Sequence, residues 1–185
     1  NFRGSVSFMI TGFGDDCQFS LATFKGSPEF LDMVFQGNVH FDGVVVTGEL
    51  TFRPDELTGA ITFREARLAN CILGGEGFEK ANFAESDMED SDLRQVDFTG
   101  ANFENANLSG ARLHGAILRD CALFGTDLSG IVIDNETEFG EYCLYDPFGG
   151  SNPVEILSQN PIEDSRYGGP VRSNTGKSVY KHAAF

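Results

Sequence analysis

Residues 81–110 read ANFAE SDMED SDLRQ VDFTG ANFEN ANLSG when they are written in blocks of five. The third residue of every block is large and apolar, the first is usually small, and the second is Asp or Asn. The apolar position recurs without a break from Phe63 to Leu128. A period of five fits neither an α-helix, with about 3.6 residues per turn, nor a strand, with about 2. The chain therefore has to turn a corner in every block.

Residues 1–62 carry a longer form of the same pattern. The apolar positions alternate steps of six and five residues, so that the true period is eleven: Phe2, Phe8, Phe13, Phe19, Phe24, Phe30, Phe35, Phe41, Val46, Phe52 and Leu57. Glycine stands two residues into the six-residue step at Gly4, Gly26, Gly37, Gly48 and Gly59. We expect positive φ at these glycines, because an inserted bulge residue needs that conformation.

One short strand and one corner per block predict an all-β solenoid. Four such sides close a square coil of about twenty residues, and the large and small positions point inward while the others face water. Coils of hydrogen-bonded strands stack about 4.8 Å apart. We therefore expect about six to seven coils, forming a rod roughly 30 Å long.

Two units, Ala101–Asn105 (ANFEN) and Ala106–Gly110 (ANLSG), resemble the A(D/N)LXX pattern of the pentapeptide-repeat family. The eleven-residue form, as in residues 24–30 (FKGSPEF), is similar to a variant of that family. The resemblance covers about residues 1–130 and implies a right-handed quadrilateral β-helix. An acidic, Lys-poor repeat followed by a tail also resembles haloarchaeal members of the family. A helical and sometimes membrane-spanning region can follow the repeat in those proteins.

The sequence predicts three parts. Residues 1–130 form the β-helix, and residues 131–148 add a last coil or cap, since Ile133, Phe139 and Leu144 keep the phase. Residues 149–185 are expected to be an irregular linker followed by the start of a short C-terminal helix. Because the chain begins with Asn1 and ends inside that expected helix, we expect a fragment of a longer protein. We expect no membrane contact by this segment, and a membrane region elsewhere in the parent stays open.

The net charge of the chain is −15. This charge repels nucleic-acid phosphates over most of the surface, so direct binding to nucleic acid is not expected. Two interpretations remain open. The acidity is either an adaptation to high salt or an imitation of DNA that is directed at a DNA-binding protein.

The cysteines and histidines favour packing and surface roles over chemistry. Cys17, Cys71 and Cys121 occupy the small inward position, where Cys replaces Ala, and no CxxC pair occurs. His40 and His114 are expected to face outward on separate coils. We therefore expect no enzyme activity, no cofactor and no metal. Cysteines without a disulfide framework favour the cytoplasm, or a cytoplasmic domain of a membrane protein.

The candidate binding surface is an acidic run. Its residues are Asp87, Glu89, Asp90, Asp92 and Asp97, and the first three share one face by phase. The sequence favours a non-catalytic structural or protein-interaction scaffold domain whose protein partner is unknown. The alternative is an acidic DNA mimic that binds and inhibits a type II topoisomerase (gyrase), resembling the quinolone-resistance members of the family. A homodimer formed by end-to-end stacking of coils is a further expectation.

Overall fold

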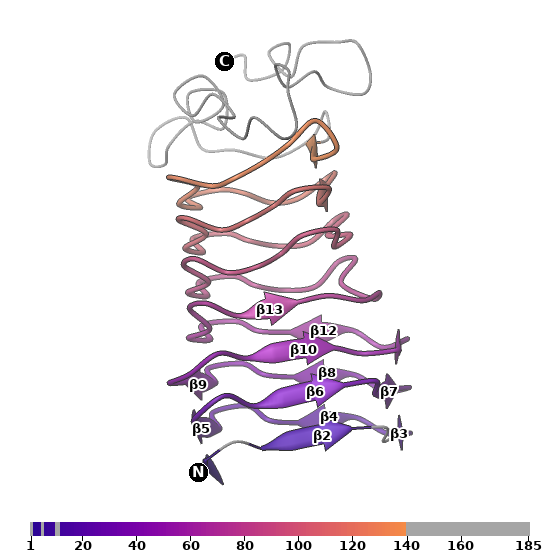
Figure 1. Cartoon of the computed structure of the whole chain (residues 1–185). Coiled ribbons are helices and arrows are strands. Elements are labelled where there is room, and N and C mark those ends of the chain that lie inside the picture. The colour runs from indigo at the N-terminus through magenta and orange to yellow at the C-terminus, as the bar shows by residue number, and fades with distance from the viewer. Residues whose placement is uncertain (1, 5, 10–11, 140–185) are drawn as a thin grey trace.

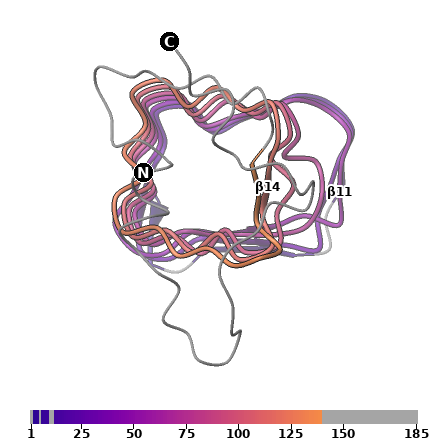
Figure 2. The same ribbon diagram turned by 90° about the horizontal axis from the view of Figure 1, so that it is seen from above.

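The computed structural model describes residues 2–4, 6–9 and 12–139, and every regular element in this part is a β-strand. The chain winds upward from its N-terminus as a right-handed coil with four sides (Figures 1 and 2). The predicted linker and helix of residues 149–185, and Leu144 of the predicted last coil, lie outside the described residues. The described residues include no helix with the length and apolar character that a membrane crossing requires.

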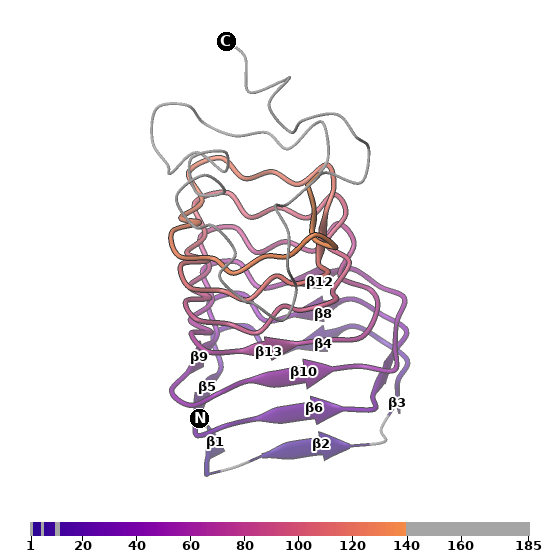
Figure 3. The same ribbon diagram turned by 45° about the horizontal axis from the view of Figure 1, so that its top comes forward.

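Each side of the coil is a ladder of short parallel strands. The first side consists of β1 (Phe2–Arg3), β5 (Thr23–Lys25) and β9 (Val45–Val46). The second side consists of β2 (Ser7–Met9), β6 (Glu29–Leu31), β10 (Thr51–Arg53) and β13 (Ile72–Leu73), which face the viewer in Figure 3. The third side contains β3 (Gly12–Phe13), β7 (Val34–Phe35), β11 (Glu56–Leu57), β14 (Ile117–Leu118) and β15 (Glu138–Phe139). The fourth side contains β4 (Cys17–Gln18), β8 (Val39–His40) and β12 (Ile61–Thr62).

The strand register confirms both sequence periods. Phe8 pairs with Phe30 and Phe30 with Phe52, so that one coil of the N-terminal part takes two eleven-residue repeats. In the C-terminal part, isolated bridges link positions twenty residues apart, as in Asp87 with Asn107. Together these ladders make about six coils. The coils with the longer repeat are broader, and they extend beyond the narrower ones at β11 (Figure 2).

The interior of the coil is a continuous apolar stack. Phe30, Phe52, Phe83 and Phe103 are fully buried, and the Phe63 and Phe83 rings stack 5.2 Å apart with an interplanar angle of 3°. Rings from neighbouring sides meet edge to face, as Phe52 does with Phe41 and with Phe63. Stacked and edge-to-face pairs both suit the aromatic quadrupole. The ladder position therefore provides most of the buried apolar surface.

Positive φ is confirmed at one set of glycines and excluded at another. Gly4 and Gly26 take positive φ, whereas Gly37, Gly48 and Gly59 do not. The prediction was wrong for these three because backbone crowding, not φ, requires glycine there. A Cβ on Gly48 would lie 2.7 Å from the backbone of Gly26, one coil below. Glycine lets the backbones of successive broad coils pack directly on one another.

The last described coil includes one extra residue. Ile133 is buried, and β15 pairs with β14 at an offset of twenty-one residues, as Ile117 with Glu138 shows. Ile133 and Phe139 both pack against the apolar core, at steps of five and six residues after Leu128. Asp134 closes this coil, because its carboxylate accepts hydrogen bonds from the backbone N–H groups of Gly115 (2.9 Å) and Thr137 (3.0 Å).

Candidate functional site

The five predicted carboxylates lie on three sides of one coil. Asp87 lies on the first side beside Arg67 and Asn107, and Asp92 lies on the second side beside Ile72 and Arg112. Glu89 and Asp90 follow Asp87 and lead into the corner between these two sides. Asp97 lies on the third side, where it pairs with Ile117. Only Asp87, Glu89 and Asp90 therefore share one region of the surface.

Three of the five carboxylates stabilise the backbone of their own turns. The second residue of a block accepts a hydrogen bond from the backbone N–H two residues later, as Asp97 does from Thr99 at 2.8 Å. Asp87, Asp92, Asn82, Asn102, Asn107 and Asp127 make the same bond. Asp and Asn form this local bond readily. This role explains why the second position holds either residue, and the sequence alone had not shown it.

The charge of Asp92 is balanced by its neighbour. Arg94 donates two hydrogen bonds to it, from Nε to Oδ1 at 2.7 Å and from one terminal nitrogen to Oδ2 at 2.6 Å. Hydrogen bonding to Arg94 lowers the pKa of Asp92 although partial burial opposes this shift. Asp92 is therefore a paired group and contributes little to an acidic surface.

Four exposed carboxylates border the first side at its two corners. We call this surface the acidic edge and define it as Glu65, Glu85, Glu89 and Asp90, all exposed. Glu65 and Glu85 occupy the same corner in successive coils, where the backbone of Glu65 bonds to Ala84. Glu65, Glu85 and Asp90 have positive φ, which places them at the third residue of their turns. Like charges stacked in this way repel one another.

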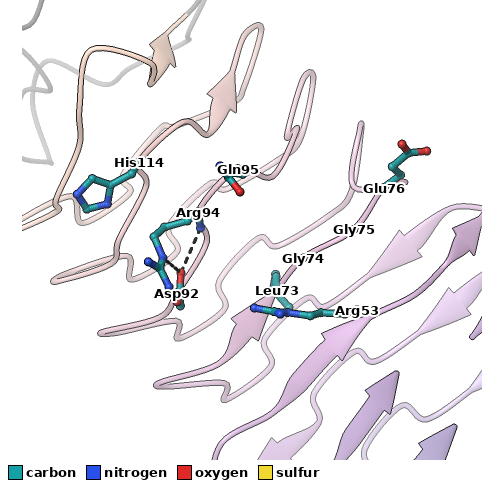
Figure 4. Close-up of a pocket in the computed structure, with 9 residues that line it drawn as sticks. All are labelled: Arg53, Leu73, Gly74, Gly75, Glu76, Asp92, Arg94, Gln95 and His114. Atoms are coloured by element: carbon teal, nitrogen blue, oxygen red, sulfur yellow. Dashed lines mark hydrogen bonds and ion pairs between the residues drawn. The ribbon is translucent and has the colours of Figure 1, made fainter. Parts of the chain in front are cut away.

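A groove of about 550 Å³ follows the corner between the second and third sides (Figure 4). It lies where the broad coils end, since β10 pairs with β13 at an offset of twenty-one residues. Arg53, Arg94 and His114 line the groove, and the backbone of Gly74 and Gly75 forms part of its wall. This groove was not predicted, because it depends on the width of successive coils and not on any one motif.

Three cysteines are buried as the sequence predicts, whereas two histidines are less exposed than expected. His40 is half-buried and its Nδ1 lies 3.2 Å from the Thr62 hydroxyl, and His114 is also half-buried. Neither histidine is fully solvated, because the neighbouring coils cover part of each ring. Cys17, Cys71 and Cys121 are buried, as the inward position predicts. Burial raises the pKa of the Cys71 thiol to about 12.

Comparison with known proteins identifies the repeat. Residues 63–100 and 91–130 match the family model described as pentapeptide repeats, with eight copies. Residues 63–130 thus consist of pentapeptide repeats. Among the curated proteins, none matches the sequence.

Solved structures of pentapeptide-repeat proteins resemble the chain distantly. Rfr23 from the cyanobacterium Cyanothece 51142 is 25% identical with a TM-score of 0.43, and the match covers 59% of this chain and 64% of that one. HetL, involved in heterocyst differentiation regulation in Nostoc sp. strain PCC 7120, is 14% identical with a TM-score of 0.24 over 83% of this chain and 91% of that one. Full-length QnrB1, a plasmid-mediated fluoroquinolone resistance protein, is 13% identical with a TM-score of 0.28 over 84% of this chain and 100% of that one. The chain thus spans less than two thirds of Rfr23.

Proposed function

We propose that this chain is a non-catalytic scaffold or protein-interaction domain of a larger protein. The observation that supports it most strongly is that the inner and outer surfaces of the coil have different roles. Large side chains such as Phe52 and Leu113 fill the interior, and both are fully buried. Most outward carboxylates of the second position serve the backbone, as Asp97 does. The flat outer ladders that remain offer area for a protein partner, and such surfaces are the usual working part of solenoids.

We further propose that residues 1–62 are the eleven-residue variant of the same family, and that the acidity reflects a haloarchaeal type of adaptation. The regular twenty-two-residue register of Phe13 with Phe35 supports the first proposal. The spread of carboxylates over at least three sides supports the second. The buried, packed thiols of Cys71 and Cys121 support a cytoplasmic location for this part of the protein.

Removal of residues 1–139 from the parent protein, in its own cells, tests the scaffold proposal. We expect the assembly or the location of the parent to change while the rate of any reaction of its other domains is retained. Turnover of a substrate by the purified chain would contradict the proposal, and so would an unchanged assembly and location after the deletion.

The alternative function is mimicry of DNA toward a type II topoisomerase such as gyrase, and the acidic edge favours it. Within it, Glu65 and Glu85 occupy the same corner one coil apart. A column of regularly spaced negative charges is the feature through which a protein surface can imitate phosphates.

A gyrase supercoiling assay tests mimicry. Chain 1–185 is added to gyrase and compared with Glu89→Gln/Asp90→Asn, which removes two exposed charges of the acidic edge. Glu56→Gln/Glu79→Gln is the matched control, because both of these residues are exposed elsewhere on the rod. Mimicry predicts inhibition by the chain and by the control, and about tenfold weaker inhibition by the edge variant. No inhibition at high excess, or equal loss in both variants, would reject it.

We also propose that two copies can stack end to end through the first coil. Strands β1 to β4 each have a strand partner on one side only among the described residues. The Phe2 ring is 39% exposed although its copy Phe24 is buried. Light scattering measures the mass of the native chain and of Phe2→Asp. A monomeric native chain would contradict the proposal, whereas a dimer lost in Phe2→Asp would support it.

A further inference from the structure

The groove between the second and third sides brings two arginines and a histidine together with two acidic residues. The chain has a net charge of −15, yet two arginines and a histidine line this one groove. Glu76 also lines it, but its side chain points away from the arginines in Figure 4. Asp92, the other acidic residue of the lining, is already held by Arg94.

Arg53 has no ion pair within the described residues. Its side chain lies over Gly74. A Cβ on Gly74 would meet the Arg53 Nε at 3.1 Å and its Cγ at 3.2 Å. In Figure 4 the side chain extends across Leu73 and Gly74 toward the pair formed by Asp92 and Arg94. The absence of a side chain at Gly74 therefore leaves room for the Arg53 side chain against the wall of the groove.

His114, which lines the groove, has an unpaired polar atom within the described residues. Its Nδ1 is buried and has no hydrogen-bond partner in the part of the chain that the structure describes. A buried polar atom without a partner is costly and rare in folded proteins. Arg94 is held at the same wall by its two hydrogen bonds to Asp92.

From these contacts we propose that the groove binds one oxyanion group, a carboxylate or a phosphate, carried by a small ligand, with Arg53 as its main partner. Guanidinium groups form paired hydrogen bonds to such oxyanions. The volume of about 550 Å³ accommodates a small molecule. A polyanion does not fit, since the rest of the surface repels it. This site is separate from the acidic edge and does not depend on the proposed scaffold role.

Amide NMR titration of chain 1–185 at constant ionic strength tests the proposal, with inorganic phosphate and N-acetylaspartate amide as the two probes. We expect at least one probe to cause saturable shifts at Gly74, Gly75 and His114. Saturation by phosphate alone identifies a phosphoryl ligand, and saturation by the aspartate derivative alone identifies a carboxylate.

Arg53→Gln is the decisive variant, and Arg64→Gln is its matched control. Arg64 is exposed in the turn that follows the fourth side, and both variants make the same change in net charge. We expect Arg53→Gln to weaken binding about tenfold, and Arg64→Gln to change it less than about twofold. Equal weakening in both variants would overturn the proposal, because it would show a general charge effect. The absence of saturable shifts at the groove with both probes would overturn it as well.

Discussion

Phe103 illustrates how much one ladder residue contributes to stability. Its ring is fully buried, stacks on Phe83 at 4.9 Å and meets Phe98 edge to face at 5.3 Å. We expect Phe103→Ala to lower the free energy of unfolding by about 3–5 kcal/mol, because rigid neighbouring coils cannot close the cavity. Urea denaturation measures this change.

The adjacent residue provides the control for that substitution. Glu104 is exposed, and we expect Glu104→Ala to change stability by less than about 0.5 kcal/mol. Equal losses in the two variants would show that the inward and outward positions are exchanged.

We expect Cys71 to make the stability of the protein decrease at alkaline pH. Burial raises its pKa to about 12, well above the usual value for a thiol, even though its hydrogen bond with Ser91 opposes this shift. The folded state therefore holds the proton more tightly than the unfolded state. The stabilisation is complete below pH 9 and is lost as the pH rises from 9 toward 12, because only the unfolded thiol ionises in that interval.

The comparison of native chain with Cys71→Ala isolates this effect. We expect the difference in unfolding free energy between them to be constant from pH 7 to pH 8. Above pH 9 it should fall by about 1.4 kcal/mol per pH unit. Urea denaturation at pH 7, 8 and 10 measures it. A difference that stays constant to pH 10 would mean that the thiol reaches water in the folded state.

At the scale of the element, glycine in the broad coils has a role that φ does not reveal. A Cβ on Gly59 would lie 2.2 Å from the carbonyl oxygen of Gly37 and 2.7 Å from the backbone nitrogen of Asn38. Neither atom can move without breaking the ladder between two coils. We therefore expect Gly59→Ala to destabilise the protein by several kcal/mol, on the order of a severe core substitution.

Gly14 is the matched glycine for that test. A Cβ there would meet only the end of the Gln36 side chain, at 3.9 Å, and its φ is not positive. Gly14→Ala should therefore leave stability unchanged or raise it by about 0.4–1 kcal/mol, because alanine restricts the unfolded chain. Thermal denaturation of both variants measures the contrast, and similar losses at the two sites would contradict the crowding argument.

The sequence predicts which residues of each repeat point inward. It does not predict the contacts between particular atoms across or within a coil. The phase of Phe63, Leu68 and Leu73 is visible in the sequence because a buried ladder permits only apolar residues. The crowding at Gly59 and the pairing of Asp92 with Arg94 depend on which atoms meet across or within a coil. The groove beside Arg53 exists because the width of the coil changes there. No single period in the sequence specifies that change.

At the scale of the whole molecule, the net charge of −15 makes stability depend on salt. Carboxylates such as Glu65 and Glu85 repel one another across coils, and dissolved ions screen this repulsion. We expect the thermal midpoint of chain 1–185 to rise between low and molar NaCl. A midpoint that is independent of salt would contradict this expectation.

The same measurement distinguishes the two interpretations of the acidity. Mimicry of DNA requires the repulsion to be concentrated at the acidic edge, whereas salt adaptation spreads it over the rod. Under the scaffold proposal, we expect Glu89→Gln/Asp90→Asn and Glu56→Gln/Glu79→Gln to reduce the salt dependence equally, because each pair removes two exposed charges. A much larger reduction of the salt dependence in the edge variant would show that the repulsion is concentrated at the acidic edge. That result would favour mimicry of DNA over salt adaptation.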